Sequence, residues 1–215
     1  MTKLEKKLYV QYGCGLSAPK DWANFDVSPT LRIQKIPILG GLLKSKLNTR
    51  FPANVLYGDI IKGLPIKEST CDGLYCSHTL AHLSLEDLRC ALVNSYIILK
   101  PGGIFRCVLP DLEYEARKYI KDLDNGNRLA SIHFLNSTLL GVNKRTRGVK
   151  GFISSFFGNA NHLWMWDYLS LSEELKKVGF KHIRSCEFND SKDSKFKSVE
   201  EEARFNKALA IECIK

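Results

Sequence analysis

The sequence lacks the paired cysteines that mark a zinc site or a disulfide-stapled fold. Its seven cysteines are odd in number and scattered along the chain, and none forms a C-x-x-C pair. Isolated cysteines of this kind are typical of reduced thiols in the cytoplasm. We therefore expect a cytoplasmic protein with neither structural disulfide bonds nor a cysteine-bound metal.

Long apolar runs are also missing. No stretch approaches the ~20 apolar residues that a membrane-spanning helix requires, and the start of the chain, Met-Thr-Lys-Leu-Glu-Lys-Lys, has no apolar signal core. We therefore expect no membrane span and no secretory leader. The 215 residues, of which 44% are hydrophobic, are enough for one domain with a core of ordinary size.

A concentrated basic patch is absent as well. The net charge is +9, which would suit an anionic partner, but the basic residues are dispersed and are densest only over 144–150. The sequence has no Asn-Pro-Pro-Tyr motif for clamping a base and no separate RNA-binding module. We therefore expect no nucleic-acid partner. The charge keeps a nucleic-acid enzyme as an alternative, which strongly salt-dependent RNA binding would favour.

What the sequence does contain is a glycine-rich turn between two short strands. Alternating apolar residues over 8–12 predict a strand that runs into Gly13-Cys14-Gly15, and 23–27 predict a second strand that carries Asp26. The glycines let a ligand approach bare main chain, and the carboxylate can accept hydrogen bonds from ribose hydroxyls. Together they predict a nucleoside site.

The spacing of this turn discriminates between nucleosides. Gly13, Gly15 and Ala18 match the dinucleotide fingerprint, but that fingerprint needs a full helix and an acid roughly 20 residues further on. Asp26 follows Gly15 by only 11 residues (26 − 15), and Pro19 interrupts any helix between them. Without a helix aimed at a pyrophosphate, S-adenosylmethionine (SAM) fits better than a nicotinamide dinucleotide, which stays as the alternative.

Strands alternate with helices along the rest of the chain. Further strands are predicted over 53–57, 71–76, 104–109, 182–188 and 207–214, and helices over 84–99, 112–123, 128–140 and 169–178. Residues 189–199 are polar and predict a mobile loop. The alternation is typical of an α/β fold with a mostly parallel sheet and helices on both faces.

Several polar or glycine residues follow these strands directly. Because ligands bind such sheets beyond the carboxyl ends of the strands, we expect these residues to share one edge. They are Gly13, Asp26, Asp59, Ser77 and Asp111.

Residues 112–166 form an insertion that is too long for an ordinary connection. We expect it to cap the substrate side of a single domain, residues 1–215. Its end and the residues that follow supply His162, Trp164, Trp166 and Tyr168. These predict either an aromatic cluster that fastens the insertion to the sheet, or a substrate wall with His162 as general base. Asp111 is the second catalytic candidate, since it could hydrogen-bond the acceptor or serve the structure alone.

His78 and His82 are four residues apart, on one face if the segment is helical. Residue 79 is Thr, which excludes the His-Glu-x-x-His motif of zinc proteases. We expect one histidine to pack at the cofactor and the other to cap or satisfy the core, without a bound metal.

Short motifs follow one another along nearly the whole chain: Tyr12-Gly13-Cys14-Gly15, 24–29, Gly58-Asp59, Leu64-Pro65, 71–83, 99–103, 108–112 and 178–180. In this order and spacing they resemble a class I SAM-dependent methyltransferase of the small type 11 group. The resemblance implies a Rossmann-like sheet of seven strands, with the last strand antiparallel, and SAM as cofactor.

The same resemblance implies roles for individual residues. Gly13 and Gly15 would pack against SAM, Asp26 would bind the ribose, and Asp59 would lie near the adenine amino group. Ser77 and His78 would line the methionine end. Neighbours expected in the same site are Cys14, Val27, Ile60 and His82.

Two departures from the family pattern bear on the acceptor. The helix after Gly15 is nearly absent, as in polysaccharide-associated members that carry a tryptophan before the second strand, here Trp22. Ala81 stands where a glutamate is common. We expect a small-molecule or saccharide-like acceptor, with O-methylation favoured over N-methylation. A nicotinamide-dependent oxidoreductase and a non-catalytic SAM-binding protein on the same fold stay as alternatives.

Overall fold

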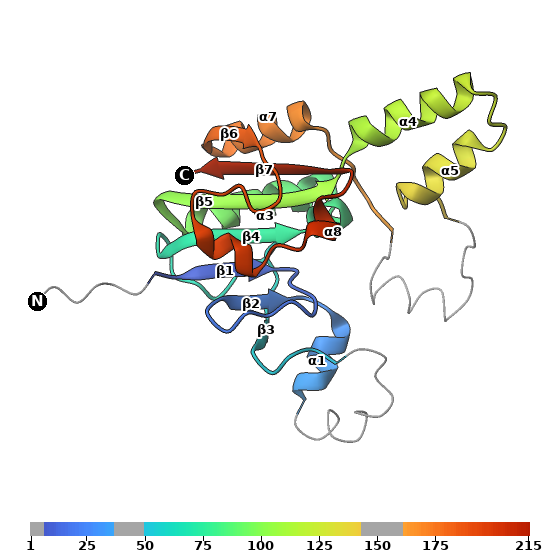
Figure 1. Ribbon diagram of the computed structural model, residues 1–215. Coiled ribbons are helices and arrows are strands. Elements are labelled where there is room, and N and C mark those ends of the chain that lie inside the picture. The colour runs from blue at the N-terminus through green and yellow to red at the C-terminus, as the bar shows by residue number, and fades with distance from the viewer. Residues whose placement is uncertain (1–6, 37–49, 143–160) are drawn as a thin grey trace, which may run out of the picture.

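The computed structural model describes residues 7–36, 50–142 and 161–215. Seven strands form one sheet in the order β3-β2-β1-β4-β5-β7-β6 (Figure 1). They are β1 (Tyr9–Tyr12), β2 (Ala23–Asp26), β3 (Val55–Tyr57), β4 (Cys71–Ser77), β5 (Leu99–Pro110), β6 (Lys181–Ser185) and β7 (Ala208–Ile214). Strand β7 is antiparallel to both of its neighbours, and the other pairs are parallel. The predicted Rossmann-like sheet with an antiparallel last strand is confirmed.

The described helices alternate with these strands. They are α1 (Pro29–Lys35), α3 (Leu85–Ile98), α4 (Leu112–Asp124), α5 (Ala130–Ser137), α7 (Tyr168–Val178) and the one-turn α8 (Glu202–Phe205), with two short 3₁₀ segments, η1 (Leu80–His82) and η2 (Ser194–Ser198). Most predicted elements are present with ends shifted by a few residues. Among residues 7–36, 50–142 and 161–215, none of the helices combines the length and the apolar character of a membrane span. All seven cysteines have free thiols.

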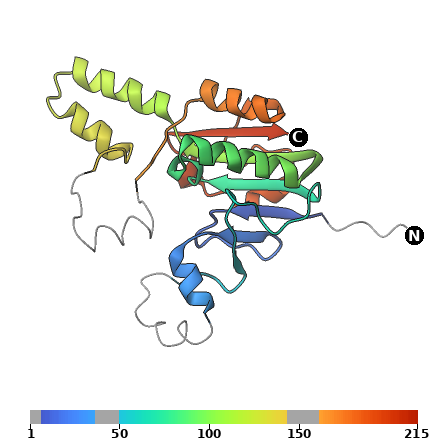
Figure 2. The same cartoon turned by 180° about the vertical axis from the view of Figure 1, so that it is seen from behind.

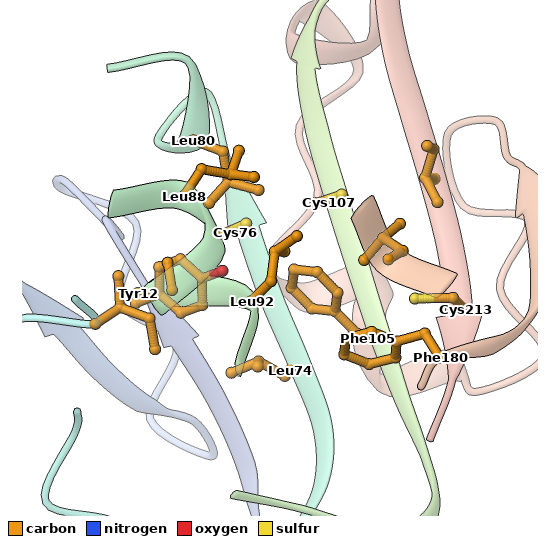
Figure 3. Close-up of a cluster of buried hydrophobic side chains, with 14 of the residues drawn as sticks. Tyr12, Leu74, Cys76, Leu80, Leu88, Leu92, Phe105, Cys107, Phe180 and Cys213 are labelled. Atoms are coloured by element: carbon orange, nitrogen blue, oxygen red, sulfur yellow. The ribbon is translucent and has the colours of Figure 1, made fainter. Parts of the chain in front are cut away.

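Helices α3 and α7 cover one face of the sheet (Figure 2). The Ser84 side chain accepts a hydrogen bond from the Asp87 amide (3.2 Å) and caps the start of α3, and Gly179, at a φ of 115°, ends α7. Between these helices and the sheet lies the main core, in which aromatic, leucine and cysteine side chains interdigitate (Figure 3). Burial of this layer supplies most of the hydrophobic stabilisation of the fold.

The opposite face is covered by the long connection between β6 and β7, residues 186–207, which we call the β6–β7 segment (Figure 1). Phe196 in η2 is fully buried, with its ring 5.6 Å from Trp22 and 6.4 Å from Tyr75. The expectation of a mobile loop over 189–199 is therefore wrong. The segment covers a face that the ten-residue link between β1 and β2 is too short to cover with a helix.

A buried ionic cluster fixes this segment to the sheet. The Arg106 guanidinium on β5 is fully buried and pairs with Glu200, with Asp190 (2.8 Å) and with Glu212 on β7 (3.1 Å). Burial acts to raise the pKa of Asp190, but hydrogen bonds from Arg184 and Arg106 outweigh it and lower that pKa to about 2. Several hydrogen bonds to one buried cation offset its desolvation.

Helices α4 and α5 form a hairpin that stands out from the carboxyl edge of the sheet (Figures 1 and 2). The Tyr119 and Phe134 rings lie 5.4 Å apart between the two helices. At the base of the hairpin the Leu112 amide donates to the Trp166 carbonyl (2.9 Å), which ties both ends of the predicted insertion together. Residues 143–160, including the densest basic run, lie outside the described residues. The role of this insertion as a cap stays a prediction.

Candidate functional site

The glycine turn lies at the carboxyl end of β1, and its two glycines have different surroundings. Gly13 and Gly15 adopt φ values of 61° and 55°, in the left-handed region that favours glycine. A Cβ on Gly13 would lie 2.0 Å from Thr79 Oγ1, so this glycine is required by close packing against the residues after β4. No atom lies within 4 Å of the corresponding position on Gly15. Gly15 is therefore the glycine that leaves main chain open to a ligand.

Asp26 joins this turn to the end of β2. Its Oδ2 accepts from the Gly15 amide (3.0 Å) and its Oδ1 accepts from the Ser28 amide (2.8 Å). A carboxylate has about four lone-pair sites, so these two bonds leave capacity for further donors such as hydroxyls. The structure thus brings the predicted glycine and the predicted acid into direct contact.

A cleft opens between the glycine turn, β4 and the β6–β7 segment. Its lining residues are Gln11, Tyr12, Gly13, Cys14, Ser17, Tyr75, Ser77, Val199, Glu201 and Arg204. The Tyr75 and Ser77 hydroxyl oxygens are buried, and neither makes a hydrogen bond of normal geometry among the described residues, although Ser77 lies close enough to counteract in part the rise in the Tyr75 pKa that burial causes. Buried hydroxyls are normally satisfied, and the enclosed part of the cleft, about 30 Å³, has room for an ordered water or a small polar group of a ligand beside them.

Cys14 lines the cleft, but its thiol is unreactive near neutral pH. Burial, assisted by the nearby charge of Asp26, raises the pKa of its thiol to about 12. The thiol is therefore neutral near pH 7, and a neutral thiol is a poor nucleophile.

The residues predicted for the adenine side follow β2 and β3. Asp59 Oδ1 accepts from the Ile61 amide (3.0 Å), and Ile60 is buried while Val27 is half exposed. The Gly58 amide donates to the Asp26 carbonyl (3.1 Å), which holds this turn beside the end of β2. Asp59 and Asp26 are thus placed on adjacent turns of the same edge.

His82 and His162 lie together, with ring centroids 4.8 Å apart. His162 Nδ1 lies 2.7 Å from the Thr138 carbonyl, and because a carbonyl can only accept, Nδ1 carries the proton. Burial lowers the pKa of His162. The neutral ring consequently keeps Nε2 unprotonated near neutral pH, which is the form that a general base needs.

His78 has a different environment. It adopts a φ of 52°, and its Nε2 donates to the Arg204 carbonyl in α8 (3.0 Å). Burial lowers its pKa as well. His78 therefore ties the end of β4 to the β6–β7 segment. Among residues 7–36, 50–142 and 161–215, no group of three histidine, cysteine or carboxylate side chains is arranged to hold a metal ion.

The remaining predicted residues are not equivalent in position. Asp111 Oδ1 accepts from the Glu113 amide (2.9 Å) and caps α4. Trp166 is 3% exposed, whereas Trp164 is 43% exposed, with the two ring centroids 6.1 Å apart. The Tyr168 hydroxyl donates to the Ile183 carbonyl of β6 (3.2 Å). Trp166 is thus buried, the Tyr168 hydroxyl is bonded within the fold, and Trp164 is partly exposed to solvent; a role for these three residues in substrate binding stays a prediction.

Four lining residues of the cleft were not predicted from the sequence: Gln11, Tyr75, Glu201 and Arg204. Gln11 and Tyr75 lie two residues before Gly13 and Ser77 on β1 and β4, so strand alternation could have placed them on the same face. Glu201 and Arg204 are almost 190 residues from the glycine turn, and no local pattern indicated their proximity.

Comparisons with known proteins agree with this geometry. Residues 11–107 match the family model described as a methyltransferase domain. A stretch of 93 residues is 32% identical to "Probable methyltransferase ltbC" of Aspergillus luteorubrus, covering 42% of this chain and 31% of that relative. The matched part thus spans about a third of the length of the curated relative.

Solved structures share the fold across nearly the whole chain. A SAM-dependent methyltransferase of Archaeoglobus fulgidus is 16% identical with a TM-score of 0.50, over 97% of this chain and 86% of that one. A Thermotoga maritima SAM-dependent methyltransferase, described as a possible histamine N-methyltransferase, is 18% identical with a TM-score of 0.50, over 99% and 84%. At these identities the likeness concerns the fold.

Proposed function

We propose that this chain, which has the class I SAM-dependent methyltransferase fold and a methyltransferase domain over residues 11–107, transfers a methyl group to a small-molecule or saccharide-like acceptor. The resemblance of the sequence motifs to class I methyltransferases agrees with the family match and with the seven-stranded sheet. The observation that carries the proposal is the contact between Asp26 and the Gly15 amide beside an open main-chain surface.

The residues at the carboxyl edge fit a nucleoside methyl donor. Asp26 has lone pairs left for ribose hydroxyls, Gly15 leaves room for a ligand, and the hydroxyl-bearing side chains of Tyr75 and Ser77 line the neighbouring cleft. The adenine would lie toward Asp59 and Ile60, and the methionyl part toward Ser77 and the cleft. When bound, SAM supplies an already activated methyl group.

The protein's own task is then to hold the acceptor in line and to receive its proton. His162 has its Nδ1 proton held by the Thr138 carbonyl, which leaves Nε2 to accept a proton from an acceptor hydroxyl. A positioned base of this kind contributes about 10²–10⁴-fold to rate. This assignment favours O-methylation over N-methylation. The exposed Trp164 ring nearby would suit the face of a sugar ring.

Methyl transfer from isotopically labelled SAM to a panel of saccharides, phenols and amines tests this function. We expect hydroxylated acceptors to be labelled, and His162→Gln to lower kcat by at least about 100-fold while KM for SAM changes little. Label only on amines, or full activity of the variant, would contradict the role of His162. His133→Gln is the matched control, because His133 is an exposed histidine on α5.

A nicotinamide-dependent oxidoreductase remains the rival enzyme, since Gly13, Gly15 and Ala18 match a dinucleotide fingerprint. The link between β1 and β2 contains no helix, so nothing in it directs a helix N-terminus at a pyrophosphate. We expect nicotinamide cofactors to leave the Tm unchanged under conditions in which S-adenosylhomocysteine raises it.

A further inference from the structure

We propose that Arg204 and Glu201, at the end of the β6–β7 segment, form a receptor for the amino-acid end of the methyl donor. This inference rests on the proposed function and adds binding residues to it. The cofactor's methionyl group ends in an α-carboxylate and an α-ammonium group, so it is zwitterionic. A guanidinium and a carboxylate side by side have the complementary charges.

Both side chains line the cleft beside the glycine turn. The cleft is bounded by Gly13 and Cys14 after β1, by Ser77 at the end of β4, and by Glu201 and Arg204 across from them. Figure 1 shows α8 beside the carboxyl end of β4, although it belongs to the last tenth of the chain. Residues remote in sequence are therefore brought to the end of the site where the methionyl group is expected.

The two charged groups are available for a ligand. Arg204 Nε lies 3.7 Å from Glu201 Oε2, and both side chains are more than half exposed, 53% and 56%. An exposed pair at this distance is worth little in water. A bound zwitterion could replace this weak pair, with its carboxylate bound to the Arg204 guanidinium and its ammonium group bound to the Glu201 carboxylate. A bidentate guanidinium–carboxylate bond is stronger than the exposed pair that it replaces.

The backbone that carries the pair is fixed, which favours binding. His78 Nε2 donates to the Arg204 carbonyl (3.0 Å), joining α8 to the end of β4. Glu200, directly before Glu201, pairs with the buried Arg106 guanidinium. Val199 is 3% exposed and packs in the same cluster as Phe196. Little ordering of the main chain is therefore required when the ligand binds.

Two ligands that differ only in the amino-acid part test the inference. S-adenosylhomocysteine carries the carboxylate and ammonium groups, and 5′-methylthioadenosine lacks both. In calorimetric titrations of the full chain we expect Arg204→Met to weaken S-adenosylhomocysteine binding at least about tenfold, the loss typical of a charged hydrogen bond. Binding of 5′-methylthioadenosine should stay within about twofold of wild type.

Glu201→Gln is the second variant. It should likewise weaken the binding of S-adenosylhomocysteine and leave the binding of 5′-methylthioadenosine unchanged. Lys195→Met is the matched control, because Lys195 is a cation on the same segment that pairs with Asp21 (2.6 Å). Equal weakening of both ligands by Arg204→Met, or no weakening of either, would overturn the receptor. If wild type binds neither ligand, the proposed function itself fails, which is a separate result.

Discussion

The Asp26 carboxylate fixes the geometry of the candidate site. Asp26 accepts hydrogen bonds from the amides of Gly15 and Ser28, and so fixes the loops after β1 and β2 relative to each other. The pairing of this acid with the glycine turn could be predicted from sequence, because parallel strands end at a common edge. The packing of Thr79 against Gly13 could not, because no pattern links the two positions.

Replacement of Asp26 by alanine should weaken S-adenosylhomocysteine binding by more than ~1 kcal/mol, the loss typical of a hydrogen bond to a charged group. Calorimetric titration measures the affinity, and thermal unfolding reports the loss of the two loop hydrogen bonds separately. Asp21→Ala, which removes an exposed carboxylate that pairs with Lys195, is the control. Unchanged affinity in Asp26→Ala would contradict the ribose role.

Gly13→Ala should destabilise the fold by several kcal/mol. The substitution combines a positive φ, which costs about 1–2 kcal/mol for a residue with a Cβ, with a collision against Thr79, and overpacking typically costs 1–3 kcal/mol. Gly126→Ala is the control, because Gly126 has a φ of 77° and no atom within 4 Å of the added Cβ. In urea unfolding, Gly13→Ala should lose more free energy of unfolding than Gly126→Ala. Equal losses for the two variants would exclude a collision with Thr79.

The buried imidazole of His162 makes stability depend on pH. Its pKa lies below the ordinary 6.5 because burial disfavours the charged ring, so the unfolded chain binds the proton more tightly. Stability should therefore fall as pH decreases below about 6.5. His162→Gln, whose amide can still donate to Thr138, should flatten the plot of Tm against pH between 7.5 and 5.5. His133→Gln should leave the plot parallel to wild type.

At the scale of elements, the β6–β7 segment differs most from what the sequence predicts. Its residues 189–199 were predicted as a mobile polar loop because they contain only two apolar residues, Phe196 and Val199, which are too few to show a periodicity. Arg106 meets Asp190, Glu200 and Glu212 at separations of 84, 94 and 106 residues. Such contacts arise only once the sheet is assembled, so local patterns cannot reveal them.

Arg106→Met should destabilise the protein by about 3–5 kcal/mol, because it leaves the fully buried Glu200 carboxylate without its cation. Arg184→Met is the comparison, since its side chain is 40% exposed and also pairs with Asp190 and Glu212. Its loss should be clearly smaller. The midpoint and slope of urea unfolding measure both variants. Similar losses for the two would indicate that burial of Arg106 does not govern the anchoring of the segment.

At the scale of the molecule, the alternation of strands and helices predicted an α/β fold with a mostly parallel sheet. The number of strands and the antiparallel β7 were predicted only through the resemblance to class I methyltransferases, and the observed sheet has both features. Which part of the chain covers the second face of the sheet could not be predicted from the sequence. The short link between β1 and β2 omits a helix there, and residues 186–207 cover the face from the other end of the chain. The same segment completes the cleft with Glu201 and Arg204.

The most direct test is a calorimetric titration of the wild-type chain with S-adenosylhomocysteine, followed by thermal unfolding in its presence. The account predicts one site per chain and, at 100 times Kd, added stability of about 2.7 kcal/mol. NAD should give neither heat of binding nor a shift in Tm. Binding of NAD without any binding of S-adenosylhomocysteine would contradict a methyl-donor site at this edge of the sheet.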